Sequence, residues 1–382
     1  MNKRVYLDNA ATTPMDPQVV EVMYQVMKED FGNPSSTHSF GRRTKGLMET
    51  ARKQIAGFLN AKTSEIIFTS GGTEADNMAI IGSVLDLGVK YIISSPIEHH
   101  AVIHTVEEIC KKENIGFSLV KILPDGHVDL ADLERLLKEN NNCLVSLMHA
   151  NNEIGNVLDI DAVGNLCEKY GALFHSDTVQ TMGHFPIDVQ KTKVHFLTCG
   201  AHKFHGPKGV GFLFKSEKLK IHALIHGGAQ ERNLRGGTEN LYGIVGMAKA
   251  FELSYNEMQE HINHIQGVKN YMIEQLEKNV PGVKFNGDYK GRSLYTVLNV
   301  SFPPSEHNEM LLFSLDINGV AASGGSACSS GSNKGSHVLG TLGVDPARGN
   351  VRFSFSKFTT KEDIDFAMEK LTEILELKKI SV

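Results

Sequence analysis

Short apolar runs alternate with longer amphipathic runs from about residue 64 onwards, and this alternation constrains the fold more than any other feature of the chain. Short apolar runs bounded by turn residues are typical of the buried strands of a parallel sheet. The amphipathic runs between them have the periodicity of helices that cover such a sheet. The predicted strands are 66–68, 91–94, 117–121, 143–148, 173–176, 196–198 and 210–214, and the predicted helices include 74–87, 101–113, 131–138 and 161–170. This part of the chain is predicted to be an α/β domain with a large, mostly parallel sheet.

A second pattern begins at Leu241. From there to Leu276 apolar side chains recur mostly at three- and four-residue spacing, and no proline occurs before Pro281. The spacing predicts one helix of about 38 residues, roughly 57 Å long at ~1.5 Å per residue. A helix of that length is expected to leave the sheet domain and enter a second one.

The remainder of the chain predicts a smaller α+β unit. Its expected strands are near 284–286, 294–300 and 351–355, and its expected helices are near 306–316 and from 361 onwards. We therefore assign residues 15–255 to a large domain and residues 1–14 plus 256–382 to a small domain. Between the predicted elements, residues 323–335 read SGGSACSSGSNKG, a composition that predicts a mobile loop with Cys328 near its middle.

Composition excludes several classes of protein. The chain has 382 residues, with 39 Lys and Arg against 44 Asp and Glu, so nucleic acid is not an expected partner. No apolar run approaches the length of a membrane span, and the N-terminus lacks the apolar core of a signal peptide. Five cysteines without a CxxC pair argue against a disulfide framework and against a zinc site. A cytoplasmic protein with reduced thiols and no membrane partner is expected.

Two charged residues stand where predicted strands end. Residues 198–211 read TCGAHKFHGPKGVG, which places Lys203 at the turn after a short strand. Asp177 ends another apolar strand, where its charge is costly unless a cation such as a protonated pyridine nitrogen pairs with it. In an open α/β sheet, ligands bind in the crevice at the carboxyl ends of the strands. Lys203 alone is more simply interpreted as a solvated loop lysine.

Two further segments also follow predicted strands. Residues 70–74 read SGGTE and open a helix, so Gly72 and Thr73 can offer N–H and hydroxyl groups to a phosphate. His99 follows the next strand and can stack on a ring or move protons. A metal site at His99 and His100 competes with this interpretation, but adjacent histidines point apart and no third ligand has the usual spacing. A phosphate cradle, an aromatic stacker, a buried carboxylate and a lysine at successive strand ends describe a pyridoxal phosphate site.

Six motifs in order resemble the cysteine desulfurases of the class V aminotransferase family. They are YLDNAATTP from Tyr6, GNPSS from Gly32, NNEIG from Asn151, HSDTVQ from His175, AHKFHGPKGVG from Ala201 and RGGTEN from Arg235. The resemblance covers nearly the whole chain, and it implies a pyridoxal phosphate-dependent transferase of fold type I. The sequence GSAC ending at Cys328 resembles the branch that supplies sulfur for nitrogenase and for general iron–sulfur cluster assembly.

The resemblance implies roles for individual residues. Lys203 would hold the cofactor as a Schiff base, Asp177 would pair with the pyridine nitrogen, Gln180 would hydrogen-bond the ring hydroxyl and His99 would stack on the ring. Gly72, Thr73 and His202 would hold the phosphate, with Gly200 nearby and Thr238 reaching across a dimer interface. Asn152 would lie near the ring hydroxyl and the substrate, and Asn33 and Arg352 would bind the substrate carboxylate.

One position departs from the family pattern. A serine often stands three residues before the lysine, and here the residue is Gly200. The phosphate shell thereby lacks one hydroxyl, which predicts weaker cofactor retention and no change of reaction.

The reaction implied by the resemblance converts L-cysteine to L-alanine. Lys203 would move the Cα proton, and Cys328, as a thiolate, would attack the substrate sulfur and become a persulfide, with His99 as a proton carrier. The other four cysteines are expected to be buried packing residues. A homodimer is expected, with an iron–sulfur scaffold or another thiolation protein as sulfur acceptor, and Cys328 could share a cluster iron during transfer. The alternatives are a selenocysteine lyase, another class V enzyme and a non-catalytic scaffold.

Overall fold

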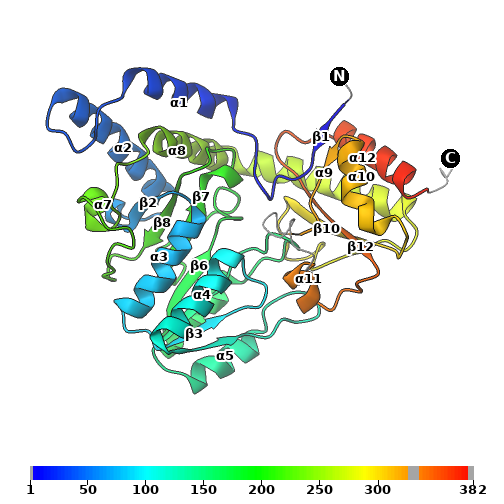
Figure 1. Cartoon of the computed structure of the whole chain (residues 1–382), viewed down its shortest axis with the longest axis horizontal. Helices are drawn as coiled ribbons and strands as arrows, with labels where there is room; N and C mark the ends of the chain where they lie inside the picture. The colour runs from blue at the N-terminus through cyan, green and yellow to red at the C-terminus, as the bar shows by residue number, and fades with distance from the viewer. Residues whose placement is uncertain (1–2, 326–334, 377–382) are drawn as a thin grey trace.

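The computed structural model describes residues 3–325 and 335–376, and Figure 1 shows their arrangement. A seven-stranded sheet forms the larger part of the molecule. Its strands follow the order β2 (Ile66–Thr69), β8 (Gly211–Lys215), β7 (Phe196–Gly200), β6 (Leu173–Asp177), β5 (Cys143–Ser146), β3 (Tyr91–Ser94) and β4 (Gly116–Leu119). Strand β8 is antiparallel to both of its neighbours, and the other pairs are parallel. The predicted α/β class with a mixed, mostly parallel sheet is confirmed.

Helices cover both faces of this sheet, because successive strand residues point to opposite sides. On one face the strands contribute Ile67, Ile92, Leu144 and Phe196 to clusters with α3 (Gly72–Leu85) and α4 (His100–Glu113). The other face packs against α1 (Pro17–Glu29), α2 (Ser39–Phe58), α5 (Leu130–Glu139), α6 (Ile160–Tyr170) and α8 (Leu241–Asn256).

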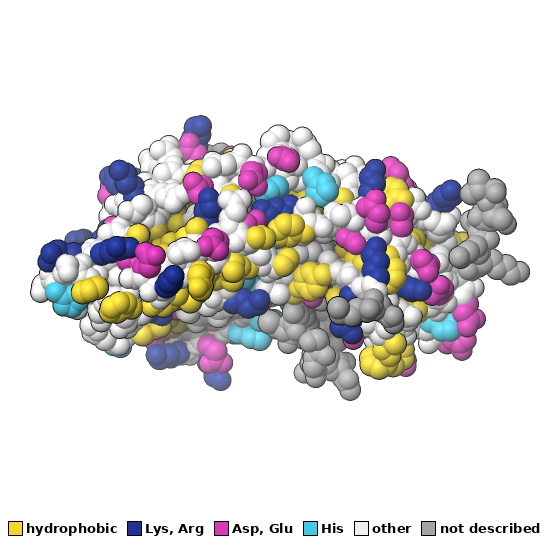
Figure 2. Space-filling model, turned by 90° about the horizontal axis from the view of Figure 1, so that it is seen from above, with side chains coloured by type: hydrophobic (Ala, Val, Ile, Leu, Met, Phe, Trp, Pro, Cys, Tyr) yellow, Lys and Arg dark blue, Asp and Glu magenta, His cyan; other side chains and the backbone are white. Residues whose placement is uncertain are grey.

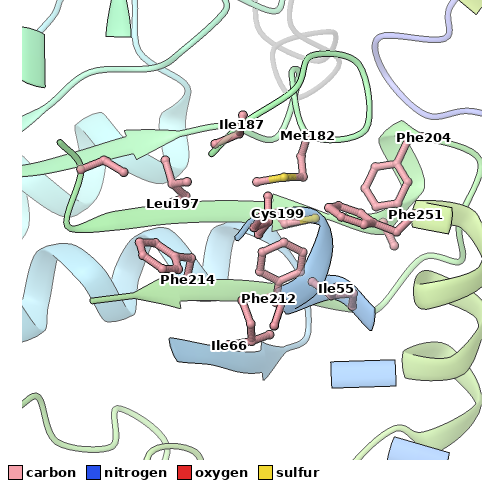
Figure 3. Packing of buried hydrophobic residues seen from close by; sticks show 14 of the residues in the cluster. Ile55, Ile66, Met182, Ile187, Leu197, Cys199, Phe204, Phe212, Phe214 and Phe251 are labelled. Carbon is pink, nitrogen blue, oxygen red and sulfur yellow. The ribbon is translucent and has the colours of Figure 1, made fainter. Parts of the chain in front are cut away.

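Phenylalanine rings fill the second of these interfaces (Figure 3). Phe251 of α8 meets Phe204 and Phe212 edge to face, with ring centroids 5.6 and 5.9 Å apart. Cys199 is also completely buried in this cluster. The other cysteines that the structure describes, Cys110, Cys143 and Cys167, are also buried in hydrophobic clusters, which confirms their expected packing role.

A second core surrounds a small antiparallel sheet. Its strands are β12 (Gly349–Ser354), β10 (Val297–Phe302) and β9 (Lys284–Phe285), and they pack with α9 (Met258–Asn279), α10 (Leu311–Ile317) and α12 (Lys361–Ile374). The N-terminal strand β1 (Val5–Tyr6) joins this part of the molecule by parallel pairing with β11 (Val320–Ala321). The division of the chain at residues 14 and 255 stays a prediction.

The prediction of a single long helix after Leu241 is wrong in one respect. Two helices, α8 and α9, occupy this stretch and are separated at Glu257, whose ψ of 10° departs from the helical value. A break of one residue leaves the spacing of apolar side chains nearly unchanged, so periodicity cannot reveal it. The expected path is observed: α8 packs in the core of the large sheet, α9 packs in the second core, and together they run across the molecule (Figure 1).

Smaller differences concern element boundaries. The strand expected at 294–300 begins at Val297, and the helix expected at 306–316 is a 3-10 turn, Asn308–Met310, followed by α10. Short elements not predicted from the sequence are α7 (Gln230–Asn233), α11 (His337–Thr341) and the 3-10 turns Thr63–Glu65 and Ala201–Lys203. Within the described residues, none of the helices has the length and apolar character needed to cross a membrane.

Candidate active site

A cavity of about 240 Å³ lies at the carboxyl ends of the parallel strands of the large sheet. The β2–α3, β3–α4 and β7 turns, the end of β6 and the segment after β5 each contribute side chains, and β12 and the N-terminal segment close the cavity from the other side. The lining residues are Ala10, Ala11, Gly72, Thr73, Asp76, His99, Met148, Asn152, Asp177, Val179, Gln180, His202, Lys203 and Arg352. Nine of the residues named from the sequence therefore lie together.

One end of the cavity is the N-terminus of α3. Gly71 caps this helix with a φ of 154°, a region that favours glycine, and no side chain of residues 3–325 or 335–376 caps the first turn. Glu74 is turned to the side, where its carboxylate accepts hydrogen bonds from Ser70 N and the Arg235 guanidinium. The backbone N–H groups at Gly72 and Thr73 thus remain available to an anion, and the helix dipole favours one there.

The floor of the cavity contains a buried carboxylate. Asp177 ends β6, is 6% exposed, and accepts a hydrogen bond from Val179 N at 2.9 Å. Burial, together with the neighbouring Asp76, raises the pKa of Asp177 to about 6. A cationic ring nitrogen above this carboxylate would favour its ionised form.

Lys203 lies opposite, in the 3-10 turn that follows β7. Its Nζ donates hydrogen bonds to the carbonyl oxygens of Ala10 at 2.6 Å and Ala11 at 2.9 Å. Gln180 Nε2 donates to the same Ala10 oxygen at 3.0 Å. The N-terminal segment therefore orients two of the predicted cofactor ligands, a role that the sequence did not indicate.

His99 forms one wall and caps α4. Its Nδ1 accepts a hydrogen bond from Ala101 N at 3.1 Å. Burial lowers the pKa of His99, so the ring is neutral near pH 7. Because Nδ1 is an acceptor in this contact, the proton of the neutral ring is on Nε2.

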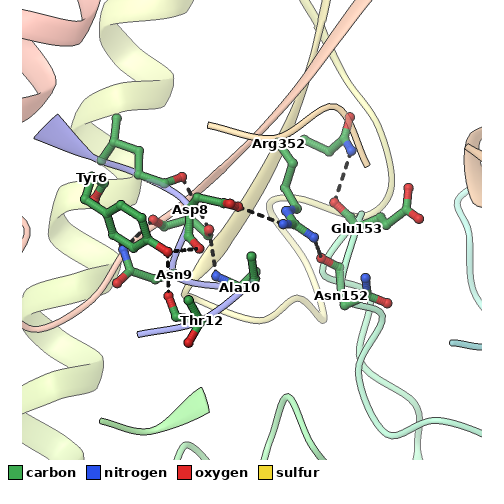
Figure 4. Close-up of polar contacts among 12 residues, drawn as sticks. Tyr6, Asp8, Asn9, Ala10, Thr12, Asn152, Glu153 and Arg352 are labelled. Carbon is green, nitrogen blue, oxygen red and sulfur yellow. Dashed lines mark hydrogen bonds and ion pairs between the residues drawn. The ribbon is translucent and has the colours of Figure 1, made fainter. Parts of the chain in front are cut away.

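Arg352 of β12 is held by two acceptors (Figure 4). Its guanidinium donates to the Asn152 carbonyl at 2.9 Å and to Asp8 Oδ1 at 2.8 Å, and only 1% of its surface is exposed. Its Nε has no hydrogen-bond partner among the described residues. Remaining N–H groups of a buried guanidinium suit an incoming carboxylate.

Four of the predicted site residues are not part of this lining. Gly200 ends β7 beside it, where an added Cβ would lie 3.6 Å from Gly72 N. Asn33 is exposed between α1 and α2, with its side-chain oxygen accepting from Ser35 N at 2.9 Å. Thr238 is exposed in the segment before α8, and Cys328 lies outside the described residues.

Sequence reasoning missed two acidic residues. Asp8 stands inside the quoted YLDNAATTP motif, but nothing local shows that it reaches Arg352, which is 344 positions away. Asp76 lies on α3, and a single acidic residue in a helix reads as a solvated side chain. Its helical spacing from Gly72 is the one signal that could have placed it beside the site.

The residues present fit pyridoxal phosphate. The group carries an anion, a ring nitrogen and an aldehyde, and the cavity offers an uncapped helix N-terminus, a buried carboxylate and a lysine amine at different walls. The floor carboxylate is the most specific of these features, because burial disfavours its charge unless a cation is bound.

Comparison with known proteins agrees with this site. The sequence model of the aminotransferase class-V family matches residues 5–366. The chain therefore belongs to the aminotransferase class-V family. It is 46% identical to the cysteine desulfurase IscS of Dictyoglomus turgidum over all of this chain and 97% of that protein.

Solved structures give the same grouping. A NifS-like protein has a TM-score of 0.90 and 36% identity, with 98% of this chain and 100% of that chain covered. A structure described as SspA in complex with cysteine has a TM-score of 0.80 and 30% identity, with 93% and 100% covered. Within its family, the chain groups with the cysteine desulfurases.

Proposed function

We propose that this chain is a pyridoxal phosphate-dependent cysteine desulfurase that converts L-cysteine to L-alanine and passes the sulfur on through Cys328. The observation that carries the proposal is the cavity, which brings Lys203, Asp177 and Arg352 together at the N-terminus of α3. Relatives named cysteine desulfurase and the cysteine complex of SspA support the substrate. The expected destination of the sulfur is iron–sulfur cluster assembly or another thiolation pathway.

Each wall of the cavity has a task in holding the cofactor. Gly72, Thr73 and His202 would bind the phosphate, Asp177 the ring nitrogen and Gln180 the ring hydroxyl. Lys203 would bind the aldehyde carbon covalently. Bound pyridoxal phosphate supplies a carbonyl carbon for the substrate amine and a cationic ring that withdraws electrons from Cα.

Arg352 and Lys203 would orient the substrate. A carboxylate bound at the Arg352 guanidinium places the amino acid between β12 and the floor carboxylate. Lys203 Nζ would remove the Cα proton, and its contacts with the Ala10 and Ala11 carbonyls hold the amine at the cavity edge. His99 would exchange a proton at Nε2, because its Nδ1 is occupied by Ala101 N.

The sulfur step is assigned to Cys328 by resemblance. The thiolate attacks the substrate sulfur, the carbon–sulfur bond of cysteine breaks and a sulfur–sulfur bond forms, so no external oxidant is required. Ser323, in the described segment that precedes Cys328 in the sequence, is adjacent to Arg352, because the two residues exchange backbone hydrogen bonds of 3.2 and 2.6 Å. A thiol presented next to Arg352 would be close to a substrate bound there.

The decisive experiment compares Cys328→Ala with the wild-type enzyme. Cys328→Ala should keep the visible absorbance of the cofactor and lose alanine formation from cysteine and the protein-bound persulfide. Cys110→Ala is the matched control, because it removes a buried thiol and should leave alanine formation unchanged. Undiminished sulfide and alanine release by Cys328→Ala would disprove the role.

A selenocysteine lyase or another class V enzyme is the alternative, and the relatives do not favour it. Alanine formation from cysteine and from selenocysteine, measured side by side, separates these activities. A homodimer, a protein sulfur acceptor and a cytoplasmic location stay predictions. Mass spectrometry of proteins that acquire persulfide sulfur from the charged enzyme in cell extract would identify the acceptor.

A further inference from the structure

Two buried side chains that the proposed reaction does not use are Asp76, which lines the cavity, and His175, which lies outside the lining. Asp76 of α3 is 1% exposed and His175 of β6 is completely buried. Asp76 Oδ1 and His175 Nε2 are 3.4 Å apart, and neither atom has a hydrogen-bond partner among the described residues. Unpaired buried polar atoms are costly, so two such atoms facing each other indicate a proton shared between them.

The rest of the cluster limits where charge can be placed. His175 Nδ1 lies 2.8 Å from the Ser146 hydroxyl, which leaves Nε2 to face Asp76. Asp177 is two residues along β6 from His175 and therefore points to the same face of the sheet. The Thr198 hydroxyl on the adjacent strand donates to Asp177 at 3.4 Å and also contacts Asp76.

Other titratable groups near this cluster do not supply a cation to Asp76. Glu98 is 1% exposed and accepts hydrogen bonds from the Ser95 hydroxyl and from Met148 N. His99 is held neutral by burial, as described above. Lys203 donates to the Ala10 and Ala11 carbonyls. If Asp76 and Asp177 were both ionised, two negative charges would lie in the same buried region. The proposed cation, the ring nitrogen, can pair with only one of them, so the other charge would be unpaired and costly.

We propose that Asp76 holds a proton near neutral pH and donates it to His175 Nε2, so that Asp177 is the carboxylate of this pair that stays ionised beneath the ring nitrogen. The hydrogen-bond chain is then complete, because His175 Nδ1–H donates in turn to Ser146 Oγ. Asp76 and His175 are positioning residues in this arrangement, since they act on the cofactor through Asp177. The role of the ring nitrogen rests on the proposed function.

The direction of the acidities agrees with this arrangement. Burial raises the pKa of Asp76 to about 7 and lowers the pKa of His175 to about 4. The pKa of Asp177 is raised less, to about 6. Between Asp76 and Asp177, the first proton taken up as pH falls therefore goes to Asp76, and Asp177 is left ionised. Burial raises the pKa of the nearby Glu98 carboxyl to about 8, so Glu98 is protonated before either of them.

Infrared difference spectroscopy of the holoenzyme without cysteine tests the proposal directly. One C=O stretch of a protonated carboxyl should be lost in Asp76→Asn and retained in Asp177→Asn, and in the wild type this band should fade as pH rises through about 7. A second such band, lost in Glu98→Gln, is expected from Glu98, whose pKa burial raises to about 8. Glu98→Gln and His149→Gln are matched controls for a buried acid and a buried histidine, and the band of Asp76 should survive in both. A band that persists in Asp76→Asn but disappears in Asp177→Asn would overturn the assignment, as would the absence of any band that Asp76→Asn removes.

Two further measurements keep the test valid if one variant folds poorly. His175→Gln should change the frequency of the Asp76 band, because the proton acceptor at Nε2 is replaced, and an unchanged frequency would contradict the pairing. The melting temperature of Asp76→Asn relative to the wild type should increase as pH rises from about 4 to about 7. Over this range the unfolded wild-type chain loses the Asp76 proton, with an ordinary pKa of 3.8, while the folded protein keeps it up to about pH 7, so only the wild type loses stability. A pH-independent difference would contradict a titrating Asp76. Both readouts use resting enzyme, so a chain without desulfurase activity would fail the alanine assay and could still pass them.

Discussion

At the scale of single residues, the site depends on side chains that hold other side chains. Asp8 binds the guanidinium of Arg352 from the N-terminal segment, and the Ala10 carbonyl receives both Lys203 and Gln180. Asp8 and Ala10 belong to the motif YLDNAATTP, which was recognisable in the sequence, but the contacts that these two residues make were not. The orientation of these cavity side chains therefore depends on the N-terminal segment, which is far in sequence from the residues that it contacts.

Gly200→Ser should tighten cofactor binding. Gly200 has extended backbone angles, and an added Cβ would meet its nearest atoms, Gly72 N and the His202 ring, at an ordinary contact distance of 3.6 Å. One new hydrogen bond of about 1 kcal/mol would lower the dissociation constant of pyridoxal phosphate about fivefold. Titration of the apo-protein with the cofactor measures this, and Gly200→Ala is the control that should show little gain. Equal or weaker binding by the serine variant would contradict the assignment of a missing phosphate ligand.

Cofactor affinity should fall at acid pH because Asp177 must be ionised to bind a cationic ring. Its pKa is raised to about 6, so the proton returns, and the affinity decreases, as pH drops below that value. One pH unit below it, the dissociation constant should be about tenfold higher. Equilibrium titrations across this range check the slope, and Asp177→Asn should bind weakly with a flatter profile. A wild-type affinity that does not change with pH would be incompatible with the assigned role.

At the scale of elements, the short α7 turn combines an unusual backbone conformation with a buried salt bridge. Glu231, Arg232 and Asn233 all have positive φ, a region that non-glycine residues rarely adopt. Glu231 is buried and binds both terminal nitrogens of the Arg52 guanidinium at 2.7 and 2.8 Å, and it also accepts from Phe68 N. The salt bridge thereby anchors the turn on α2 and β2, close to the Arg235 contact with Glu74.

Glu231→Gln should destabilise the protein strongly, because it removes the buried carboxylate that pairs with Arg52 and leaves that guanidinium paired with Glu49, whose side chain is 40% exposed. The expected loss in the free energy of unfolding is about 3 kcal/mol, measured by urea denaturation. Lys191→Ala is the control: it removes an exposed ion pair with Asp188 and should change stability by less than about 0.5 kcal/mol. A loss no larger than that of the control would show that the turn is held by other contacts.

At the scale of the whole molecule, apolar side chains are exposed over α1 and the segment after it. Tyr24, Met27, Phe31 and Phe40 are each at least 47% exposed, and α1 also presents Val20. Figure 2 views the molecule from this side and shows hydrophobic side chains distributed over the face. Exposed apolar residues in such number are typical of an interface, which agrees with the predicted homodimer.

Met27→Glu combined with Phe31→Ser should therefore weaken self-association. Sedimentation should show a dimer for the wild type and a species near the 42.0 kDa of one chain for the double variant. Leu123→Ser, which alters an exposed apolar residue on another segment, should leave the dimer intact. A wild type that sediments as a monomer would refute the prediction.

The sequence by itself determined the α/β class, the alternation of strands and helices and five of the cavity residues, Gly72, Thr73, His99, Asp177 and Lys203, while the family resemblance supplied Asn152, Gln180, His202 and Arg352. This was possible because strand and helix periodicity, turn glycines and strand-end charges are local properties of a chain. The family motifs added the reaction and the role of Cys328, which stay expectations for the residues concerned.

Only the tertiary structure decided which distant segments meet. It separated α8 from α9 at Glu257, paired β1 with β11, brought Asp8 to Arg352 and placed Asp76 against His175. Such contacts join residues far apart in the sequence, so no local pattern records them. Their physical effects, a buried ion pair and a shared proton, exist only where folding excludes water.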